Sequence, residues 1–352
     1  MIDYNKLMKQ CINLAKKGTG NVSPNPLVGC IVLNQNNEII ATGYHHKYGE
    51  NHAERDALLK LKNGEEKNGT LIVNLEPCSH HGKTPPCADL IIERKLKRVV
   101  IGCKDSNPKV GGQGIAKLKN AGIEVIENIL KKECKELNKI FFTDVEKHRT
   151  YVALKTATTL DGKIATKNGD SKWITSDNSR KEVRKIRKKY DAILTSSATV
   201  IADNPEMKHK IKIILDQDLK TNINSTIYQQ GKIFLVVKES IDTTKITNAN
   251  ITVIKCPQKD NNLDLNTLMQ KLYEYKIKSI LIEAGGTLNG SFIKENLVDE
   301  IYHFIAPKIL NDNTGKSCFN GDDINKISYC KKFNIEFCKK FGDDILIKYT
   351  SI

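Results

Sequence analysis

The chain has 352 residues, a formal net charge of +15 and ten cysteines, and this length suits two domains that each bury a core. The positive charge is spread along the chain without a basic tail, so we interpret it as a lysine-rich solvated surface and expect no nucleic-acid partner. No run of about 18 uncharged apolar residues occurs, which argues against any membrane association through a spanning helix.

The first part of the chain alternates helix-like and strand-like segments. We expect helices at 3–17, from 52 onward, at 87–95 and at 115–121, and strands at 28–33, 70–75, 98–102 and 123–126. This alternation predicts an α/β domain in which helices cover both faces of a sheet.

A polar segment around His148 marks the expected domain boundary, which gives domains at 1–147 and 148–352. The second part has six strand candidates, at 151–157, 191–196, 211–216, 232–237, 279–284 and 301–306. Two stretches rich in Asn and Lys, 242–250 and 258–266, are expected to be loops.

The cysteines and the amino-terminal segment indicate the cellular compartment. The cysteine spacing is irregular for a disulfide framework, which favours a reducing environment. The first ten residues, MIDYNKLMKQ, lack the charged and apolar regions of an export signal. We therefore expect a cytoplasmic protein.

Four residues, His52, Glu54, Cys78 and Cys87, have the pattern of a zinc-dependent deaminase. His52 and Cys87 are each expected at the start of a helix, where a thiolate is stabilised. Two thiolates and one imidazole leave the fourth tetrahedral position of zinc for water, whose pKa zinc lowers to about 7. Glu54 is then placed to carry the proton of that water to departing ammonia.

A structural zinc site is the alternative for this pattern. Such a site closes its tetrahedron with a fourth Cys or His, and His80 and His81 are near in sequence. A non-catalytic zinc protein would also not need Glu54. One departure separates the chain from nucleoside and tRNA deaminases: eight residues lie between Cys78 and Cys87, where those enzymes typically have two.

Nine motifs resemble the bifunctional deaminase-reductases of riboflavin biosynthesis, in order and over essentially the whole chain. Those resembling the deaminase half are SPNPLVGC (23–30), GYHHKYGENHAE (43–54), LEPCSHHGKTPPC (75–87) and KDSNPKVGGQG (104–114). Those resembling the reductase half are LKTATTLDGKIA (154–165), SKWITS (171–176), AILTSSATVIADNP (192–205), IEAGGTLNGSF (282–292) and IAPKIL (305–310).

This resemblance implies a fold and two reactions. The implied fold is a cytidine-deaminase-like three-layer α/β/α domain followed by a dihydrofolate-reductase-like α/β domain. The first domain, with one Zn²⁺ per chain, would deaminate 2,5-diamino-6-(5-phosphoribosylamino)pyrimidin-4-one. The second would use NADPH to reduce the ribosyl group to ribityl. The implied partner is therefore a small phosphorylated pyrimidine, and a homo-dimer or homo-tetramer is the expected assembly.

In the deaminase half, the resemblance implies the same zinc ligands, His52, Cys78 and Cys87, with Glu54 as proton shuttle. It also implies a set of substrate-binding residues, which are Asn25, His45, His80, Lys83, Thr84, Asp105 and Asn107. Taken alone, an asparagine before a proline, such as Asn25, is an ordinary turn residue.

In the reductase half, the resemblance implies contacts with NADPH and with the substrate. The cofactor contacts are Ala157, Trp173, Thr199, Asp203, Gly285, Gly286, Thr287, Leu288, Asn289, Gly290 and Ser291. The substrate contacts are Lys155, Ser171, Arg187, Met207, Lys210 and Glu283. The glycines end a strand candidate before a helix expected near Leu288, where backbone N–H groups can hold a phosphate.

Three points in the reductase half stay open at this stage. Trp173, the only tryptophan, is also compatible with a core aromatic. Asp203 and Glu283 are both candidates for the proton donor. Lys210 stands where relatives have an arginine, so a chain with only the deaminase activity and a degenerate second half is an alternative. A tRNA deaminase with an accessory domain is disfavoured by the cysteine spacing and the lack of stacking aromatics.

Overall fold

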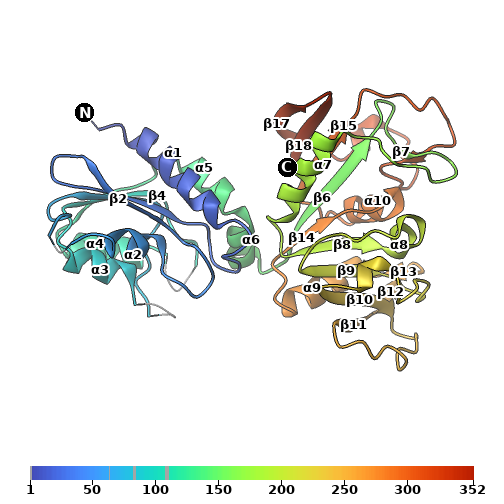
Figure 1. Ribbon diagram of the computed structural model, residues 1–352, viewed down its shortest axis with the longest axis horizontal. Helices are drawn as coiled ribbons and strands as arrows, with labels where there is room; N and C mark the ends of the chain where they lie inside the picture. The colour runs from blue at the N-terminus through green and yellow to red at the C-terminus, as the bar shows by residue number, and fades with distance from the viewer. Residues whose placement is uncertain (1, 63, 82–84, 108–110) are drawn as a thin grey trace. The chain divides into compact units, whose positions relative to one another are not determined.

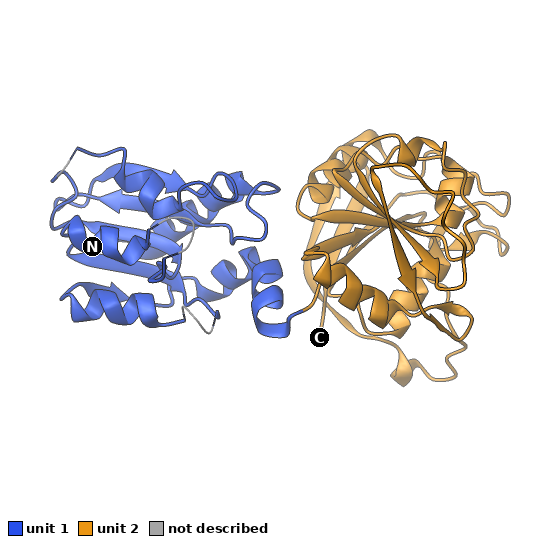
Figure 2. Ribbon diagram, turned by 90° about the horizontal axis from the view of Figure 1, so that it is seen from below, with its two compact units in different colours: residues 1–148 blue, residues 149–352 orange. Residues whose placement is uncertain are grey.

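The computed structural model describes residues 2–62, 64–81, 85–107 and 111–352. The chain forms two compact units, 1–148 and 149–352 (Figure 2). Each unit has its own sheet and its own buried core.

Unit 1 contains a five-stranded sheet of order β2-β1-β3-β4-β5. Its strands are β1 (Gly29–Leu33), β2 (Ile39–Tyr44), β3 (Thr70–Leu75), β4 (Arg98–Cys103) and β5 (Glu124–Ile126). Its helices are α1 (Tyr4–Ala15), α2 (Ala53–Leu58), α3 (Cys87–Glu93), α4 (Gln113–Asn120), α5 (Lys131–Leu137) and α6 (Lys139–Lys147), with a 3-10 turn at Lys16–Gly18. β1 is antiparallel to β2 and β3, whereas β3, β4 and β5 are parallel.

The two faces of this sheet carry different helices, because successive strand side chains point to opposite sides. Leu71 and Val73 of β3 pack in a cluster with buried residues of α2, α3 and α4. Ile72, between them, packs in a second cluster with α1, α5 and α6. Unit 1 is therefore a three-layer α/β/α domain, as the sequence predicts (Figure 1).

Unit 2 contains a nine-stranded sheet of order β11-β10-β9-β8-β14-β6-β15-β18-β17. Its strands are β6 (Tyr151–Thr158), β8 (Ala192–Ser196), β9 (Ile211–Leu215), β10 (Lys232–Lys238), β11 (Ile251–Cys256), β14 (Ser279–Ile282), β15 (Glu300–Ile305), β17 (Phe333–Phe341) and β18 (Asp344–Ser351). The first seven are mutually parallel, and β17 and β18 form an antiparallel pair that continues the sheet.

Helices cover both faces of this sheet as well. They are α7 (Asp177–Arg187), α8 (Ser197–Asp203), α9 (Leu265–Glu274) and α10 (Gly286–Lys294). Short pieces complete the unit, namely β7 (Lys163–Ala165), β12 (Gln258–Lys259), β13 (Asn262–Leu263), β16 (Lys316–Ser317) and 3-10 turns at Thr226–Tyr228 and Ile327–Tyr329. One core cluster joins α9 and α10 to one face, and another joins α8 to the opposite face.

The strands expected from the sequence all form, but two helical regions differ from the expectation. The stretch 258–266 is not only loop, since it contains the β12–β13 hairpin and the first two residues of α9. Asp264 caps α9 by accepting from the backbone N–H groups of Asn266 and Thr267, which explains why so polar a segment starts a helix. α10 begins at Gly286, two residues before the helix start that the sequence indicates.

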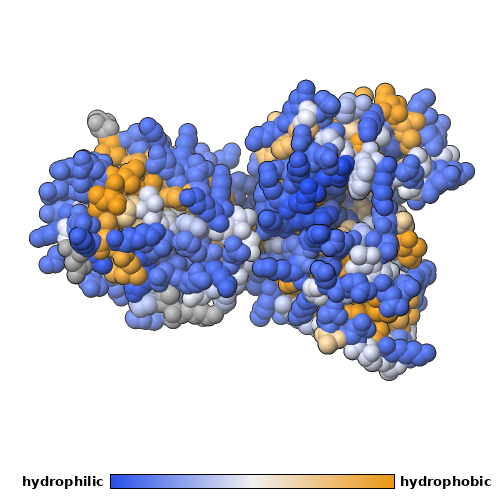
Figure 3. Space-filling view, viewed as in Figure 1, coloured by the Kyte–Doolittle hydropathy of each residue, from blue (hydrophilic) through white to orange (hydrophobic). Residues whose placement is uncertain are grey.

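No helix in the described part of the chain is long and apolar enough to span a membrane. Figure 3 shows hydrophilic residues over most of one face, which agrees with a lysine-rich solvated surface.

Two glycines of α10 are required for packing. A Cβ added to Gly286 would lie 2.2 Å from the Ser317 carbonyl oxygen, and one added to Gly290 would lie 1.6 Å from that of Asn320. The segment 317–320 thus rests directly on the helix backbone, and the Asn320 N–H donates to the Gly286 carbonyl over 2.9 Å. By contrast, Gly285 has no atom within 4 Å of an added Cβ.

We predict that Gly290→Ala destabilises unit 2. In an open helix interior this change stabilises by about 0.5–1 kcal/mol, but here the clash with Asn320 reverses the sign, with a loss of about 1–3 kcal/mol. Denaturant unfolding followed by circular dichroism measures the difference. Gly321→Ala is the control, because an added Cβ meets nothing within 4 Å there. A Gly290→Ala protein as stable as Gly321→Ala would contradict this packing.

Candidate functional site

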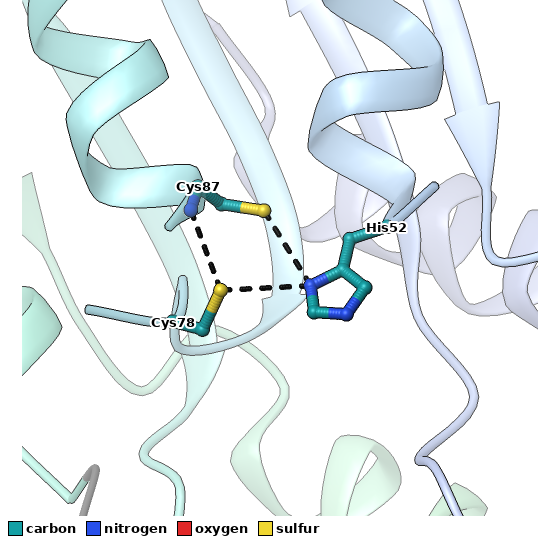
Figure 4. Close-up of side chains that lie close together, drawn as sticks. All are labelled: His52, Cys78 and Cys87. Atoms are coloured by element: carbon teal, nitrogen blue, oxygen red, sulfur yellow. Dashed lines mark hydrogen bonds between the residues drawn. The ribbon is translucent and has the colours of Figure 1, made fainter. Parts of the chain in front are cut away.

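Three metal-ligating side chains meet at one edge of the unit 1 sheet (Figure 4). His52 is the N-cap of α2, and Cys87 is the first residue of α3 after the N-cap Pro86. Cys78 lies in the segment that follows β3. Both helix starts were predicted from the sequence, and together they bring ligands 26 and 35 residues apart into one cluster.

The spacing of the three ligand atoms fits a tetrahedral ion. The His52 Nδ1 atom lies 3.5 Å from the Cys78 Sγ and 3.6 Å from the Cys87 Sγ. Bonds of about 2.3 Å to sulfur and about 2.0 Å to nitrogen at tetrahedral angles give an S···N separation of about 3.5 Å. Among the described residues the cluster has three members. This donor set fits zinc with one position left for another ligand.

The two thiols differ in proton affinity. Hydrogen bonding with Cys87 lowers the pKa of the Cys78 thiol, with a further contribution from His52. The Cys87 N–H also donates to the Cys78 Sγ over 3.3 Å, from the first turn of α3. A thiolate is therefore readily available at Cys78, which metal binding requires.

Glu54 lies beside this cluster and is buried, with 3% of its surface exposed. Burial raises the pKa of its carboxyl group to about 7. A carboxyl group with a pKa near neutrality both accepts and releases a proton readily.

A pocket of about 270 Å³ opens at the cluster and is formed by unit 1 alone. It brings together most of the residues that the sequence assigned to the deaminase site, which are Asn25, His45, His52, Glu54, Cys78, His80, Asp105 and Asn107. Lys83 and Thr84, also assigned to this site, lie outside the described residues. His80 is exposed and lines the pocket.

His45 is held in one tautomer. Its Nδ1 lies 2.9 Å from the Asn51 carbonyl oxygen, which only accepts, so Nδ1 carries the proton. Its Nε2 then accepts from the Asn25 side-chain amide over 3.2 Å. Burial lowers the pKa of the ring, so it favours the neutral form. Asn25 is therefore more than a turn residue, because it contacts a buried pocket histidine.

The pocket also contains residues that the motifs did not single out. Among them are the exposed Tyr48 and Glu50, the buried Glu76 and Phe141 of α6. The motifs quoted from the sequence include Tyr48, Glu50 and Glu76. The motifs do not indicate, however, that these side chains line the pocket. Phe141 lies in a segment for which the sequence predicted no helix, so nothing indicated that it reaches the pocket.

In unit 2, a half-buried charged group forms from three predicted substrate residues. Arg187, the last residue of α7, contacts Glu283 through two bonds, Nε to Oε1 at 2.6 Å and Nη2 to Oε2 at 3.0 Å. Burial acts to raise the pKa of Glu283, but Arg187 outweighs it and holds the pKa below its ordinary value. Burial lowers the pKa of Lys155 on β6, and Glu283 opposes that effect.

Trp173 is not a core residue, because 62% of its surface is exposed. The Arg180 guanidinium lies 4.3 Å from its ring centre, and the Lys308 ammonium donates to its carbonyl over 2.8 Å. This excludes the core interpretation and leaves the indole available to a ligand.

The other predicted cofactor residues have different surroundings. Ala157 is on β6, two residues after Lys155 and on the same face. Thr199 and Asp203 belong to α8, which follows the carboxyl end of β8. In the glycine loop, Gly285 is open, whereas Asn289 is fully buried and donates to the Cys318 carbonyl over 3.0 Å. Thr287 is exposed, and Ser291 and Leu288 are half-buried.

The remaining predicted substrate residues are placed less favourably for a side-chain contact. Met207 is buried in the apolar cluster around α8. Lys210 is exposed immediately before β9, at the amino end of that strand. Ser171 is half-buried in the segment between β7 and α7.

Both units match described protein families. Residues 1–103 match the cytidine and deoxycytidylate deaminase zinc-binding region, and residues 150–347 match the RibD C-terminal domain.

Whole-length relatives are also found. The riboflavin biosynthesis protein RibD of Actinobacillus pleuropneumoniae is 42% identical, covering 100% of this chain and 95% of that protein. The RibD of Escherichia coli is 34% identical over 97% of both.

Solved structures agree with these relatives. Acinetobacter baumannii RibD has a TM-score of 0.88 at 32% identity, over 99% of both chains. A diaminohydroxyphosphoribosylaminopyrimidine deaminase/5-amino-6-(5-phosphoribosylamino)uracil reductase from Thermotoga maritima has a TM-score of 0.87 at 36% identity, also over 99% of both.

We predict one zinc ion per chain, held by His52, Cys78 and Cys87. Cys78→Ser removes a thiolate ligand, so metal analysis of the purified protein should show far less than one zinc per chain. His80→Ala and His81→Ala should retain the full zinc content, because neither belongs to the three-ligand cluster. Loss of zinc from either histidine variant would instead indicate a closed, structural site.

Proposed function

The chain belongs to the RibD family, the bifunctional deaminase-reductases of riboflavin biosynthesis, and we propose how its own residues divide the two reactions. We assign deamination of 2,5-diamino-6-(5-phosphoribosylamino)pyrimidin-4-one to the pocket of unit 1. We assign reduction of the ribosyl group of its product, with NADPH, to unit 2. The observation that carries the deaminase assignment is the three-ligand cluster, which opens on a pocket beside the buried Glu54.

In unit 1, His52, Cys78 and Cys87 would hold one zinc ion. A zinc ion there supplies a Lewis acid that lowers the pKa of water to about 7. Glu54 takes a proton from the attacking water and delivers it to the departing amine, and its carboxyl pKa of about 7 suits both steps.

The substrate is recognised by polar groups around this centre. Asn25, His45, Asp105 and Asn107 line the pocket and present amide, imidazole and carboxyl groups to the edge of a pyrimidine. The neutral His45 adds no charge beside the zinc ligands. Lys83, with His80, is proposed to meet the phosphate.

In unit 2, the half-buried group of Lys155, Arg187 and Glu283 is proposed to hold the ribosyl end of the substrate. The nicotinamide cofactor supplies the hydride. Glu283 is a poor proton donor, since Arg187 keeps it ionised. Lys155 is the better candidate, because burial lowers its pKa and eases proton release.

Two features support NADPH as the reductant. The open Gly285 precedes α10, so a phosphate can approach the helix start without meeting a side chain. Lys220 follows the carboxyl end of β9 and Lys238 is the last residue of β10, and both pair with Asp218, at 3.3 and 2.8 Å. Two lysines and one aspartate carry a net charge of +1. We propose that this charge attracts the additional phosphate that distinguishes NADPH from NADH. Gly286, Asn289 and Gly290 shape the loop by packing against 317–320.

A chain with only the deaminase activity is the second candidate, since Lys210 replaces an arginine of relatives. The intact ion pair of Arg187 and Glu283 favours the two-activity assignment. Incubation with the diaminopyrimidine, with and without NADPH, and product identification by mass distinguish the two, because only an active unit 2 consumes NADPH.

Glu54→Gln should abolish ammonia release while leaving zinc bound. Loss of the proton shuttle is expected to lower kcat by about 10²–10⁴-fold. The reductase rate, measured with the deaminated product and NADPH, should be unchanged. Glu93→Gln, an exposed carboxylate at the end of α3, is the matched control. A Glu54→Gln protein that deaminates normally would refute the assigned role.

Trp173 provides a direct probe of cofactor binding, because it is the only tryptophan. NADPH bound beside the exposed indole should quench its emission in a saturable titration. NADH should need at least about tenfold higher concentration, a difference of about 1.4 kcal/mol. Trp173→Phe supplies the background signal, and Lys238→Ala should reduce the preference. Equal affinity for both cofactors would contradict the NADPH assignment.

A further inference from the structure

We propose that Glu76 is a positioning residue of the deaminase. Its buried carboxylate fixes the segment that presents Asp105 and Asn107 to the pocket, and ties that segment to the loop of Cys78. This inference rests on the proposed function, in which Asp105 and Asn107 bind the pyrimidine.

The Glu76 carboxylate accepts three backbone hydrogen bonds. Its Oε2 accepts from the N–H groups of Asp105 at 3.2 Å and Gly112 at 2.9 Å, and its Oε1 accepts from that of Ile115 at 3.2 Å. Only 4% of Glu76 is exposed. Hydrogen bonds to a charged acceptor are stronger than neutral ones, and burial away from water makes their loss costly.

Two of these bonds supply a cap that α4 lacks. The N-cap residue of α4 is Gly112, with a φ of 84° and no side chain to accept from the first turn. Glu76 takes that place from another part of the chain, and its negative charge also suits the positive end of the helix dipole. Glycine is needed at 112 for the positive φ, so a local cap cannot substitute.

The third bond extends to the substrate residues. The Asp105 N–H donates to Glu76, the Asp105 Oδ1 accepts from the Asn107 N–H at 2.8 Å, and the Asn107 carbonyl accepts from the Gly111 N–H at 2.7 Å. Each polar residue is thus oriented by the one before it. This series of hydrogen bonds starts at the Glu76 carboxylate, which accepts from Asp105. It also returns to that carboxylate, because Gly112, the residue after Gly111, donates to it as well.

Glu76 also stands next to the metal cluster in the chain. Its N–H donates to the Cys103 carbonyl at 3.0 Å, and Cys78 follows two residues later. An added Cβ at Gly114 would lie 2.0 Å from the Pro77 carbonyl oxygen and 3.2 Å from the Glu76 Oε1, so the start of α4 packs tightly on this stretch. The segment that carries Cys78 and the segment that carries Asp105 and Asn107 are therefore both held by Glu76.

This arrangement predicts a specific kinetic defect. Glu76→Gln keeps the size of the side chain but turns an NH₂ group toward N–H donors. The Asp105 segment should shift, while His52 and Cys87 keep their positions at the starts of α2 and α3, and Cys78 keeps its hydrogen bond from the Cys87 N–H. We expect the KM for the diaminopyrimidine to rise about tenfold, with kcat within about threefold, full zinc content and an unchanged reductase rate.

Glu66→Gln is the matched control for a merely structural carboxylate. Glu66 is a fully buried glutamate of the same unit, pairs with Arg94 at 2.8 Å, and precedes β3, whereas Glu76 follows it. Glu66→Gln should lower stability without changing KM. Hydrogen-exchange mass spectrometry of the peptide covering 103–116 should show faster exchange in Glu76→Gln only.

The outcomes separate cleanly. If wild-type protein does not deaminate the pyrimidine, the proposed function fails. If it does, and Glu76→Gln keeps zinc with an unchanged KM, the positioning role is wrong. If Glu76→Gln loses zinc, Glu76→Asp is measured in the same way, and loss of zinc from both variants would assign Glu76 a purely structural role.

Discussion

The deaminase centre depends on the meeting of two helix starts at one edge of a sheet. α2 contributes His52 from its N-cap, and α3 contributes Cys87 from its first turn. A helix start has unpaired N–H groups and a positive dipole end, so it stabilises the thiolates that a metal requires. The Cys87 N–H that points at the Cys78 sulfur is one such group. The pocket, Glu54 and the substrate segment are all arranged around this point.

Three carboxyl groups of this chain, two buried and one half-buried, have different surroundings. Burial raises the carboxyl pKa of Glu54 into the range of proton transfer, although the neighbouring His52 acts to lower it. Glu283 is half-buried and paired with Arg187, which holds its pKa below the ordinary value, so we propose that it orients rather than donates a proton. Glu76 is surrounded by backbone N–H groups and serves as a fixed acceptor. The same side chain thus has a different role according to which partners surround it.

Much of the fold and of the deaminase site follows from local sequence patterns. Alternating apolar runs predict the strands, and the prolines before Cys87 predict the helix that carries it. The His52 and Glu54 spacing places both in the first turn of α2, which the structure shows. The stretch 258–266 was misjudged because Asp264 caps a helix from within a polar run. Capping by a single side chain is a weak signal beside strong loop composition.

The rest could not be predicted because it depends on contacts between distant segments. The glycines of 285–290 resemble a phosphate-binding loop in sequence, yet Gly286 and Gly290 are needed for the approach of 317–320 and only Gly285 is open. No local sequence pattern distinguishes a glycine that leaves room for a ligand from a glycine that leaves room for another segment of the backbone. Glu76 is similar, since its three donors lie 29 to 39 residues away. A motif therefore identifies which residues matter at such positions, while the long-range packing decides what each one does.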